Sequence, residues 1–329
     1  VLEELVERLT AAKRSAERPI PKLARILGPV ALEPPDVDVT PLPSKPTARQ
    51  VIEAARASSV ARLLLQLPDA RLGTDPEGVH QARVASRRMR SDLKTFEPLL
   101  DSAWSKGLAA ELGWLIDGLG AVRDADILGV KLRDVIARHP EFNHDAARRV
   151  LLQLQLQRRR DRRRLLRHLG SKRAVVLFDH LVAASAEPAT VSRADRRAGD
   201  VMPKLVRKRW KRLDRAIGRL GRHPRPAELH AVRILAKRVR YAAEAVAPAA
   251  GKQARKFAED AARIQDALGE LNDAAVARAW LIECAERLDG PAAFAAGQIA
   301  QQLVVEARTH DKRWLAAHES MTKRTAWFS

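Results

Sequence analysis

Apolar residues recur along most of this chain every three or four positions, the spacing that places them on one face of an α-helix. We find no convincing run of alternating apolar and polar residues of the kind that a half-buried β-strand requires. The pattern therefore predicts an all-α fold made of long helices. Proline and glycine breaks place them at about residues 47–67, 76–97, 101–121, 123–138, 142–168, 171–185, 194–219, 226–247, 250–268, 271–288 and 291–318.

Two of the expected helices carry the same eleven-residue basic pattern. It is His-x-x-Arg-(Val/Ile)-x-x-(Arg/Lys)-Arg-(Met/Val)-Arg, at residues 80–90 and again at residues 230–240. A second pattern, Leu-Gly-x-x-(Arg/Asn)-Asp-Ala, follows each copy at residues 119–125 and 268–274. The copies lie 150 residues apart for the first pattern and 149 for the second. Two patterns at nearly one offset indicate an internal duplication.

The duplication and the prolines together predict the domain organisation. After a proline-rich linker at residues 29–46, we expect two homologous halves of one domain, residues 47–190 and residues 191–329. Each half is expected to form an antiparallel bundle of the four-helix type, with pseudo-two-fold symmetry between the bundles. Residues 1–28 are expected to form a short helical segment of their own.

Helical geometry turns each basic pattern into a stripe of cations. Residues at i, i+3, i+7 and i+10 fall within one narrow sector of an α-helix and extend over about 15 Å. The stripes contain His80, Arg83, Arg87 and Arg90 in the first copy, and His230, Arg233, Lys237 and Arg240 in the second. Lys94 extends the first stripe by one turn, whereas Glu244 stands at the matching position of the second. Arg88 and Arg238 lie between the stripe and the apolar face of each helix.

Signals for a helix start stand ahead of both stripes. Asp75 and Pro76 provide a cap and a proline suited to the first turn, and Pro226 holds the matching place in the second copy. His80 and His230 are therefore expected near a first turn. Free N–H groups and the positive end of the helix dipole attract anions there.

Further basic residues lie outside the repeated pattern. On the helix before the second copy, a tight stripe with one flanking arginine is a candidate lining of the same anion site: Lys204, Lys208, Lys211 and Arg207. The densest run, residues 158–164, has arginines pointing all round its helix, so we expect a solvated surface there.

Composition narrows the class of partner. Lys and Arg number 60 against 40 Asp and Glu, and this excess favours nucleic acid, an acidic membrane surface or a phosphate polymer. Aromatic residues make up only 4%, which argues against single-strand binding through stacking platforms. Apolar residues reach 46%, so the chain can bury a sizeable core and is not a disordered basic tail.

The stripes also have a plainer interpretation, as solvated helix faces. Histidine at the same place in both copies favours anion binding, and we expect a protonated imidazole to donate to phosphate. A zinc site lacks further ligands at helical spacing, and general-base catalysis lacks a nucleophile. We therefore predict no metal, no cofactor and no catalytic residue. Asp124 and Asp273 are expected to pair with arginines and hold helix ends in register.

The two copies of the basic pattern resemble the signature segments of the CHAD domain, a family whose name abbreviates conserved histidine α-helical domain. The Leu-Gly-x-x-(Arg/Asn)-Asp-Ala pair is similar to its secondary signatures, and the match covers roughly residues 47–319. The resemblance implies two four-helix bundles, a basic surface or pore between them, and binding of inorganic polyphosphate without catalysis. Residues 5–27 look like the end of a CYTH-type triphosphate tunnel domain, although the Glu-x-Glu-x-Lys signature of the tunnel enzymes is absent.

The leading hypothesis is thus a non-enzymatic module that binds inorganic polyphosphate, for which phosphate or sulfate can stand in. The alternatives are a protein that binds the nucleic-acid backbone and a phosphoanhydride hydrolase. The predicted site residues are His80, Arg83, Arg87, Arg88, Arg90, Lys94, Lys204, Arg207, Lys208, Lys211, His230, Arg233, Lys237, Arg238 and Arg240. The sequence leaves open whether the two stripes form one site or two.

The expected location follows from three features of the sequence. No apolar run approaches the roughly 20 residues that span a bilayer, and no signal peptide is visible. The single cysteine, Cys284, fits a buried residue in a reducing compartment. We therefore expect a cytoplasmic protein without a transmembrane segment, associated with polyphosphate granules.

Overall fold

A computed structural model describes residues 37–73, 75–308 and 313–328 of the chain. The chain divides into two compact units, Val1–Asp38 and Val39–Ser329. The first unit lies almost wholly outside the described residues. The predicted helical segment at residues 1–28, its similarity to a CYTH domain and the first part of the linker therefore fall outside them. The description below concerns the second unit.

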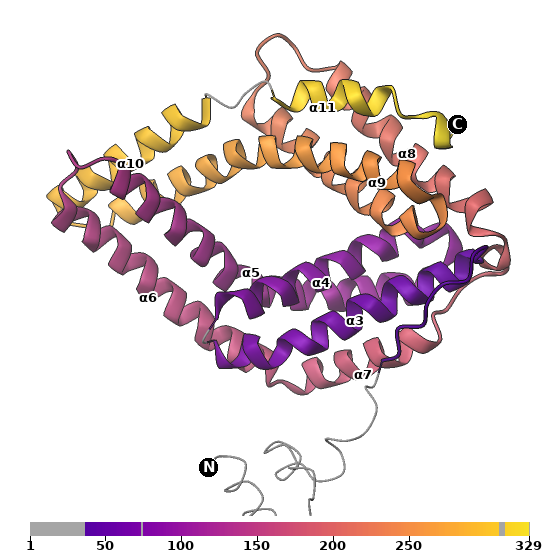
Figure 1. Ribbon diagram of the computed structural model, residues 1–329. Helices are drawn as coiled ribbons and strands as arrows, with labels where there is room; N and C mark the ends of the chain where they lie inside the picture. The colour runs from indigo at the N-terminus through magenta and orange to yellow at the C-terminus, as the bar shows by residue number, and fades with distance from the viewer. Residues whose placement is uncertain (1–36, 74, 309–312, 329) are drawn as a thin grey trace, which may run out of the picture. The chain divides into compact units, whose positions relative to one another are not determined.

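Helices make up the regular structure of the described residues, which confirms the all-α prediction (Figure 1). No β-strand occurs in these ranges, where β-pairing is limited to two isolated bridges. The α-helices are α3 (Ala48–Leu72), α4 (Pro76–Phe96), α5 (Ser102–Arg138), α6 (His144–Leu169), α7 (Lys172–Ala186), α8 (Ala198–Gly218), α9 (Pro226–Ala285), α10 (Gly290–Arg308) and α11 (Arg313–Thr322).

Several helices run further than the sequence suggests. The helices expected at 101–121 and 123–138 are one helix, α5, because Gly120 stays helical within it. The three expected between 226 and 288 form α9, which kinks at Gly251. Gly251 has φ 73° and ψ −152°, a backbone conformation that only glycine adopts readily. The helix expected at 291–318 corresponds to α10 and the first part of α11, with residues 309–312 outside the described residues.

Both motif helices begin where their signals predict. The Asp75 carboxylate accepts a hydrogen bond from the Glu77 backbone N–H at 2.8 Å, and Pro76 occupies the first turn of α4. In α9, Pro226 follows Arg225, whose backbone N–H donates to the Glu228 carboxylate at 2.7 Å. These starts place residues 80–90 and 230–240 entirely within helices.

The helices of the second unit fall into two groups in Figure 1. Helices α3 to α7, indigo to rose, form one group, and α8 to α11, salmon to yellow, form the other. One hydrophobic core joins the groups through α5, α6, α9 and α10, and its largest members include Leu132, Ile136, Phe142, Leu281, Ile299 and Leu303. Each predicted half contributes two of these four helices, so the halves share a core.

Other contacts fix the ends of the unit. Trp210, Phe257 and Phe328 pack together between α8, α9 and the C-terminal turn, with Trp210 and Phe257 edge to face. The Pro46 carbonyl accepts a hydrogen bond from the Ala198 N–H at 3.0 Å, which fastens the end of the proline-rich stretch to the start of α8. Cys284 is buried, as expected. None of the described helices is both long and apolar enough to cross a membrane.

Candidate anion-binding site

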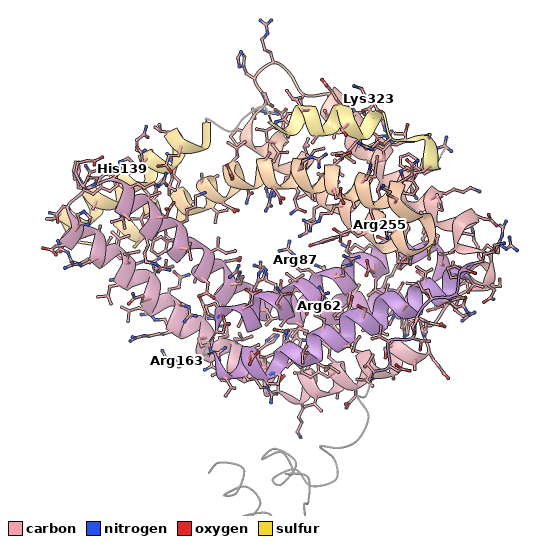
Figure 2. All side chains as sticks on the ribbon, viewed as in Figure 1. Arg62, Arg87, His139, Arg163, Arg255 and Lys323 are labelled. Atoms are coloured by element: carbon pink, nitrogen blue, oxygen red, sulfur yellow. The ribbon has the colours of Figure 1, made fainter. Side chains whose placement is uncertain are left out.

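A cavity of about 830 Å³ lies where α3, α4, α5 and α9 meet. Its walls carry one lining acid, Glu244, and eight cationic side chains: Arg62, Arg83, Arg87, Arg88, Arg123, Arg233, Lys237 and Arg240. Figure 2 shows the side chain of Arg87 pointing from α4 toward α9. The cavity is therefore strongly electropositive, and the charge comes from four helices.

Both copies of the basic pattern line this one cavity. Burial lowers the pKa of Arg87, and the neighbouring cations Arg83 and Arg233 lower it further. Arg83 belongs to the same copy as Arg87, whereas Arg233 belongs to the other. On α9, the Lys237 Nζ lies 5.7 Å from the centre of the Tyr241 ring, which also lines the cavity. The lining of one cavity therefore includes cations from both stripes.

Only some of the lining cations are neutralised within the protein. Arg83 donates to the Asp124 carboxylate at 2.7 Å, which confirms the expected arginine partner of Asp124, although this residue lies within α5 rather than at a helix end. Glu244 accepts from Arg240 at 2.8 Å and also from Arg88 across the contact between α4 and α9. Among the described residues, no carboxylate pairs with the remaining five lining cations: Arg62, Arg87, Arg123, Arg233 and Lys237.

The glycines of the second repeated pattern lie next to arginines of the two stripes. A Cβ atom added to Gly120 would lie 3.6 Å from the Arg83 guanidinium, and one added to Gly269 would lie 3.7 Å from that of Arg233. The Leu-Gly pair of each repeat thus sits beneath the first arginine of a stripe. The glycine leaves room for the flat guanidinium to lie along the neighbouring helix. The leucines, Leu119 and Leu268, are buried in the core.

The two motif histidines have different surroundings. His80 lines the cavity. Burial lowers its pKa, and the nearby Arg123 and Arg83 lower it further, while Glu77 opposes them. His230 is exposed and lies outside the lining, where its Nδ1 contacts the Asn272 side-chain oxygen at 2.5 Å. Donation to a bound anion by both histidines stays a prediction, and only His80 is placed to act within the cavity.

The other predicted site residues lie away from the cavity lining. Lys204, Arg207, Lys208 and Lys211 form an exposed face of α8. Arg90 lies over Gly113 of α5, 3.5 Å from where its Cβ would be, and Lys94 and Arg238 are exposed. In the arginine run at residues 158–164, Arg158 binds Asp126 and Arg162 binds the last carbonyls of α3, so the run is only partly solvated.

Sequence reasoning missed four residues beside the stripes. Arg62 and Arg123 line the cavity, and the place of Arg123 in the second repeated pattern was the available signal. Arg56 and Asp92 are 8% and 7% exposed. Burial raises the pKa of Asp92 to about 7 against the opposing effects of Arg88 and Arg56. Arg56 stacks over Trp104 with its guanidinium carbon 4.5 Å from the ring centre. No periodic signal marks a carboxyl buried among arginines.

The site offers little for metal or carboxylate chemistry. Within the described ranges, no group of three or more His, Cys, Asp or Glu side chains is arranged to hold a metal ion. Asp273, the matching residue of Asp124, accepts from the Asn272 amide at 3.3 Å, and no arginine pair for it is found in the described part of the chain. The arrangement is suited to holding an extended anion.

Comparison with known proteins agrees with this fold. A model of the CHAD domain matches residues 54–282. The "Uncharacterized protein Rv2226" of Mycobacterium tuberculosis is 33% identical over 314 residues, which are 92% of this chain and 58% of that protein. The chain thus spans somewhat more than half the length of this relative.

Two solved structures resemble the chain closely in fold. "PptA from Streptomyces chartreusis" has a TM-score of 0.69 at 23% identity, over 83% of this chain and 99% of that one. The CHAD domain from the plant Ricinus communis has a TM-score of 0.68 at 25% identity, over 89% of this chain and 96% of that one. Since the family model covers more than half of the sequence, this chain belongs to the CHAD domain family.

Proposed function

We propose that this chain binds inorganic polyphosphate in the cavity between α3, α4, α5 and α9 and performs no reaction on it. The observation that supports the proposal is the set of eight lining cations, six of them from the two copies of the basic pattern, with five of the eight lacking a carboxylate partner among the described residues. Membership in the CHAD family supports a binding role.

The chemistry of the lining fits a chain of phosphates. Arginine guanidinium groups donate paired hydrogen bonds to phosphate oxygens, and lysine supplies a compact positive charge. Arg87, Arg233 and Lys237 have no internal carboxylate to displace, so an anion gains their full attraction. Polyphosphate carries about one charge on each unit and no bases, which suits a lining whose aromatic member is Tyr241.

The alternatives fit the cavity less well. Binding of a nucleic-acid single strand through stacking calls for several aromatic platforms, and Tyr241 is the aromatic residue among the lining residues described. Hydrolysis of a phosphoanhydride calls for carboxylates that hold Mg²⁺ beside the phosphates. Glu244 is the lining carboxylate, and it is already bound by Arg88 and Arg240.

The proposal is tested by removing the unpaired cations together. Arg87→Ala/Arg233→Ala/Lys237→Ala should abolish polyphosphate binding in a filter or calorimetric assay, because each charge-assisted contact contributes about 1.5–3 kcal/mol. The matched control is Arg159→Ala/Arg163→Ala/Lys172→Ala, which removes the same charges from exposed positions on α6 and α7. Helical circular dichroism should be unchanged in both. An equal loss of polyphosphate binding in both triple variants would mean that binding depends only on net charge, and it would overturn the cavity as the site.

Two further measurements separate the alternatives. Duplex DNA or RNA at equal phosphate concentration should fail to displace polyphosphate, and displacement would favour the nucleic-acid alternative. Pure protein incubated with polyphosphate and Mg²⁺ should release no orthophosphate. Metal-dependent release that the cavity triple variant lacks would show a hydrolase.

A further inference from the structure

A second group of cations lies at the end of α4, outside the cavity lining. It consists of Arg90 and Lys94 on α4, Arg209 and Arg212 on α8, and Arg238 on α9. Burial lowers the pKa of Lys94, and so do Arg90, Arg238 and Arg209 in that order. Burial likewise lowers the pKa of Arg209, followed by Arg212 and Arg238. Three helices therefore hold these five side chains, the α4–α8–α9 cluster, in one electrostatic neighbourhood.

The α4–α8–α9 cluster is not neutralised by the protein. No carboxylate in the described part of the chain forms an ion pair with any of the five, and the acid that acts on Lys94 and Arg209 is Glu97, at a distance. The Nε atoms of Arg90 and Arg209 are buried without a hydrogen-bond acceptor. Arg209 is held in place by donating to the Lys94 carbonyl at 2.5 Å. Like charges gathered this closely destabilise the fold unless an anion lies among them.

Comparison of the two repeats shows that this cluster lacks a carboxylate that is present at the matching contact. Arg88 and Arg238 occupy matching positions of the two copies, and so do Lys94 and Glu244. Arg88 binds Glu244 across the contact between α4 and α9. Arg238 instead lies close enough to Lys94 to lower its pKa, so this matching pair of positions holds two cations, whereas Arg88 and Glu244 form an ion pair.

We infer that the α4–α8–α9 cluster is a second phosphate-binding subsite, in which a phosphate group takes the place that the Glu244 carboxylate holds in the matching contact. The charge, the buried unpartnered Nε atoms and the absence of a local carboxylate all favour a tetrahedral oxyanion. The class of ligand rests on the proposed function. A polyphosphate chain and a separate phosphorylated molecule would present the same groups to this subsite.

Titration calorimetry with tripolyphosphate tests the inference on the full chain. Wild type should show two sites. Lys94→Glu, which installs the residue found at the matching position, should form an ion pair with Arg238 and remove one site, weakening it by about 10- to 100-fold. Lys172→Glu, the same charge change at an exposed position of α7, should keep both sites.

Titration with long-chain polyphosphate gives the number of chains bound to each protein. One chain that saturates both sites would identify a single polyphosphate chain as the ligand, whereas two chains per protein would indicate separate ligands.

The outcomes for the two proposals are distinct. Two full sites in Lys94→Glu, or a single wild-type site that only Arg87→Ala/Lys237→Ala removes, would overturn the second subsite and leave the cavity proposal intact. If Arg87→Ala/Lys237→Ala keeps both sites while Lys94→Glu loses one, the cavity proposal fails and the α4–α8–α9 cluster stands. Unchanged circular dichroism in each variant shows that binding, rather than folding, is measured.

Discussion

The two copies of the basic pattern carry His, Arg or Lys at the same five positions and differ in what surrounds them. The copy on α4 places His80, Arg83, Arg87 and Arg88 in the cavity, whereas the copy on α9 places Arg233, Lys237 and Arg240 there and leaves His230 and Arg238 outside. The buried Asp92 of α4 corresponds to Ala242 of α9. The two copies thus contribute different sets of side chains to one cavity, so some matching positions have different surroundings.

The largest expected difference concerns Asp92, which has no counterpart in the second copy. Burial raises the pKa of Asp92 to about 7, above the usual aspartate value of 3.8. The folded state therefore binds this proton more tightly than the unfolded state. The stability that Asp92 confers is fully present below pH 3.8 and is lost as pH rises toward 7, by up to about 1.4 kcal/mol for each pH unit.

Asp92→Asn should remove this pH dependence. Denaturant melts from pH 4 to pH 8 should show the variant gaining stability relative to wild type as pH rises, with the difference levelling off above pH 7. Asp117→Asn, an exposed carboxyl of α5, is the control and should follow the wild-type curve. Parallel curves for wild type and Asp92→Asn would show that this carboxyl titrates normally and that the two motif helices differ less than the structure indicates.

The next largest effect is expected at Arg87 and Lys237, two matching positions with similar surroundings. Arg87 and Lys237 both line the cavity without a carboxylate partner. Arg87→Ala and Lys237→Ala should each weaken polyphosphate binding by about 10- to 100-fold, the loss of one charge-assisted contact. A large effect of one substitution and none of the other, measured by calorimetry at one salt concentration, would mean that a single copy carries the binding.

The sequence predicts those features of the fold that depend on neighbouring residues, and it misses those that depend on packing between distant parts of the chain. Local signals, such as the Asp75–Pro76 cap and the spacing of the stripes, predict the helices and the charged faces correctly. The joining of 101–121 with 123–138 escapes such reasoning, because tertiary packing of Leu119 and Val122 outweighs the weak break at Gly120.

The site itself divides in the same way. The repeated stripes predict Arg83, Arg87, Arg233 and Lys237, all of which line the cavity. Arg209 and the Asp92 carboxyl depend on contacts between helices far apart in the chain, and no pattern along a single helix reveals them. The role of Glu244 was visible only as a departure from the repeat, an acid where the first stripe has a lysine.

The bridge made by Glu244 gives a prediction of intermediate size. Glu244→Gln keeps an oxygen acceptor near Arg88 and Arg240 but removes the negative charge from the cavity wall. Polyphosphate binding should tighten by about three- to tenfold, since a repulsive charge is lost and two cations are released. Thermal stability should fall slightly at the same time.

The control for this bridge is Glu259→Gln, an exposed residue of α9 outside the cavity that makes the same change in net charge. It should leave affinity nearly unchanged. Weaker binding in Glu244→Gln would mean that Glu244 positions Arg88 and Arg240 for the ligand. This positioning would then contribute more to affinity than the repulsion between the Glu244 carboxylate and the ligand.

The smallest expected effect concerns the motif histidines. In the free protein, burial and the neighbouring Arg123 and Arg83 lower the pKa of His80, so its imidazole is largely neutral near pH 7. A polyanion bound beside it favours the protonated form, and binding is then accompanied by proton uptake. Affinity should therefore rise as pH falls from 8 to 6. His80→Gln should reduce this rise in affinity by about threefold at pH 6, because the variant lacks one protonated donor whose charge is partly screened by solvent.

His230→Gln should keep the wild-type pH profile, because His230 lies outside the lining and contacts Asn272. Equal flattening in both variants would show that the two histidines act alike, and the contrast between the copies would then be confined to Asp92 and the bridge at Glu244.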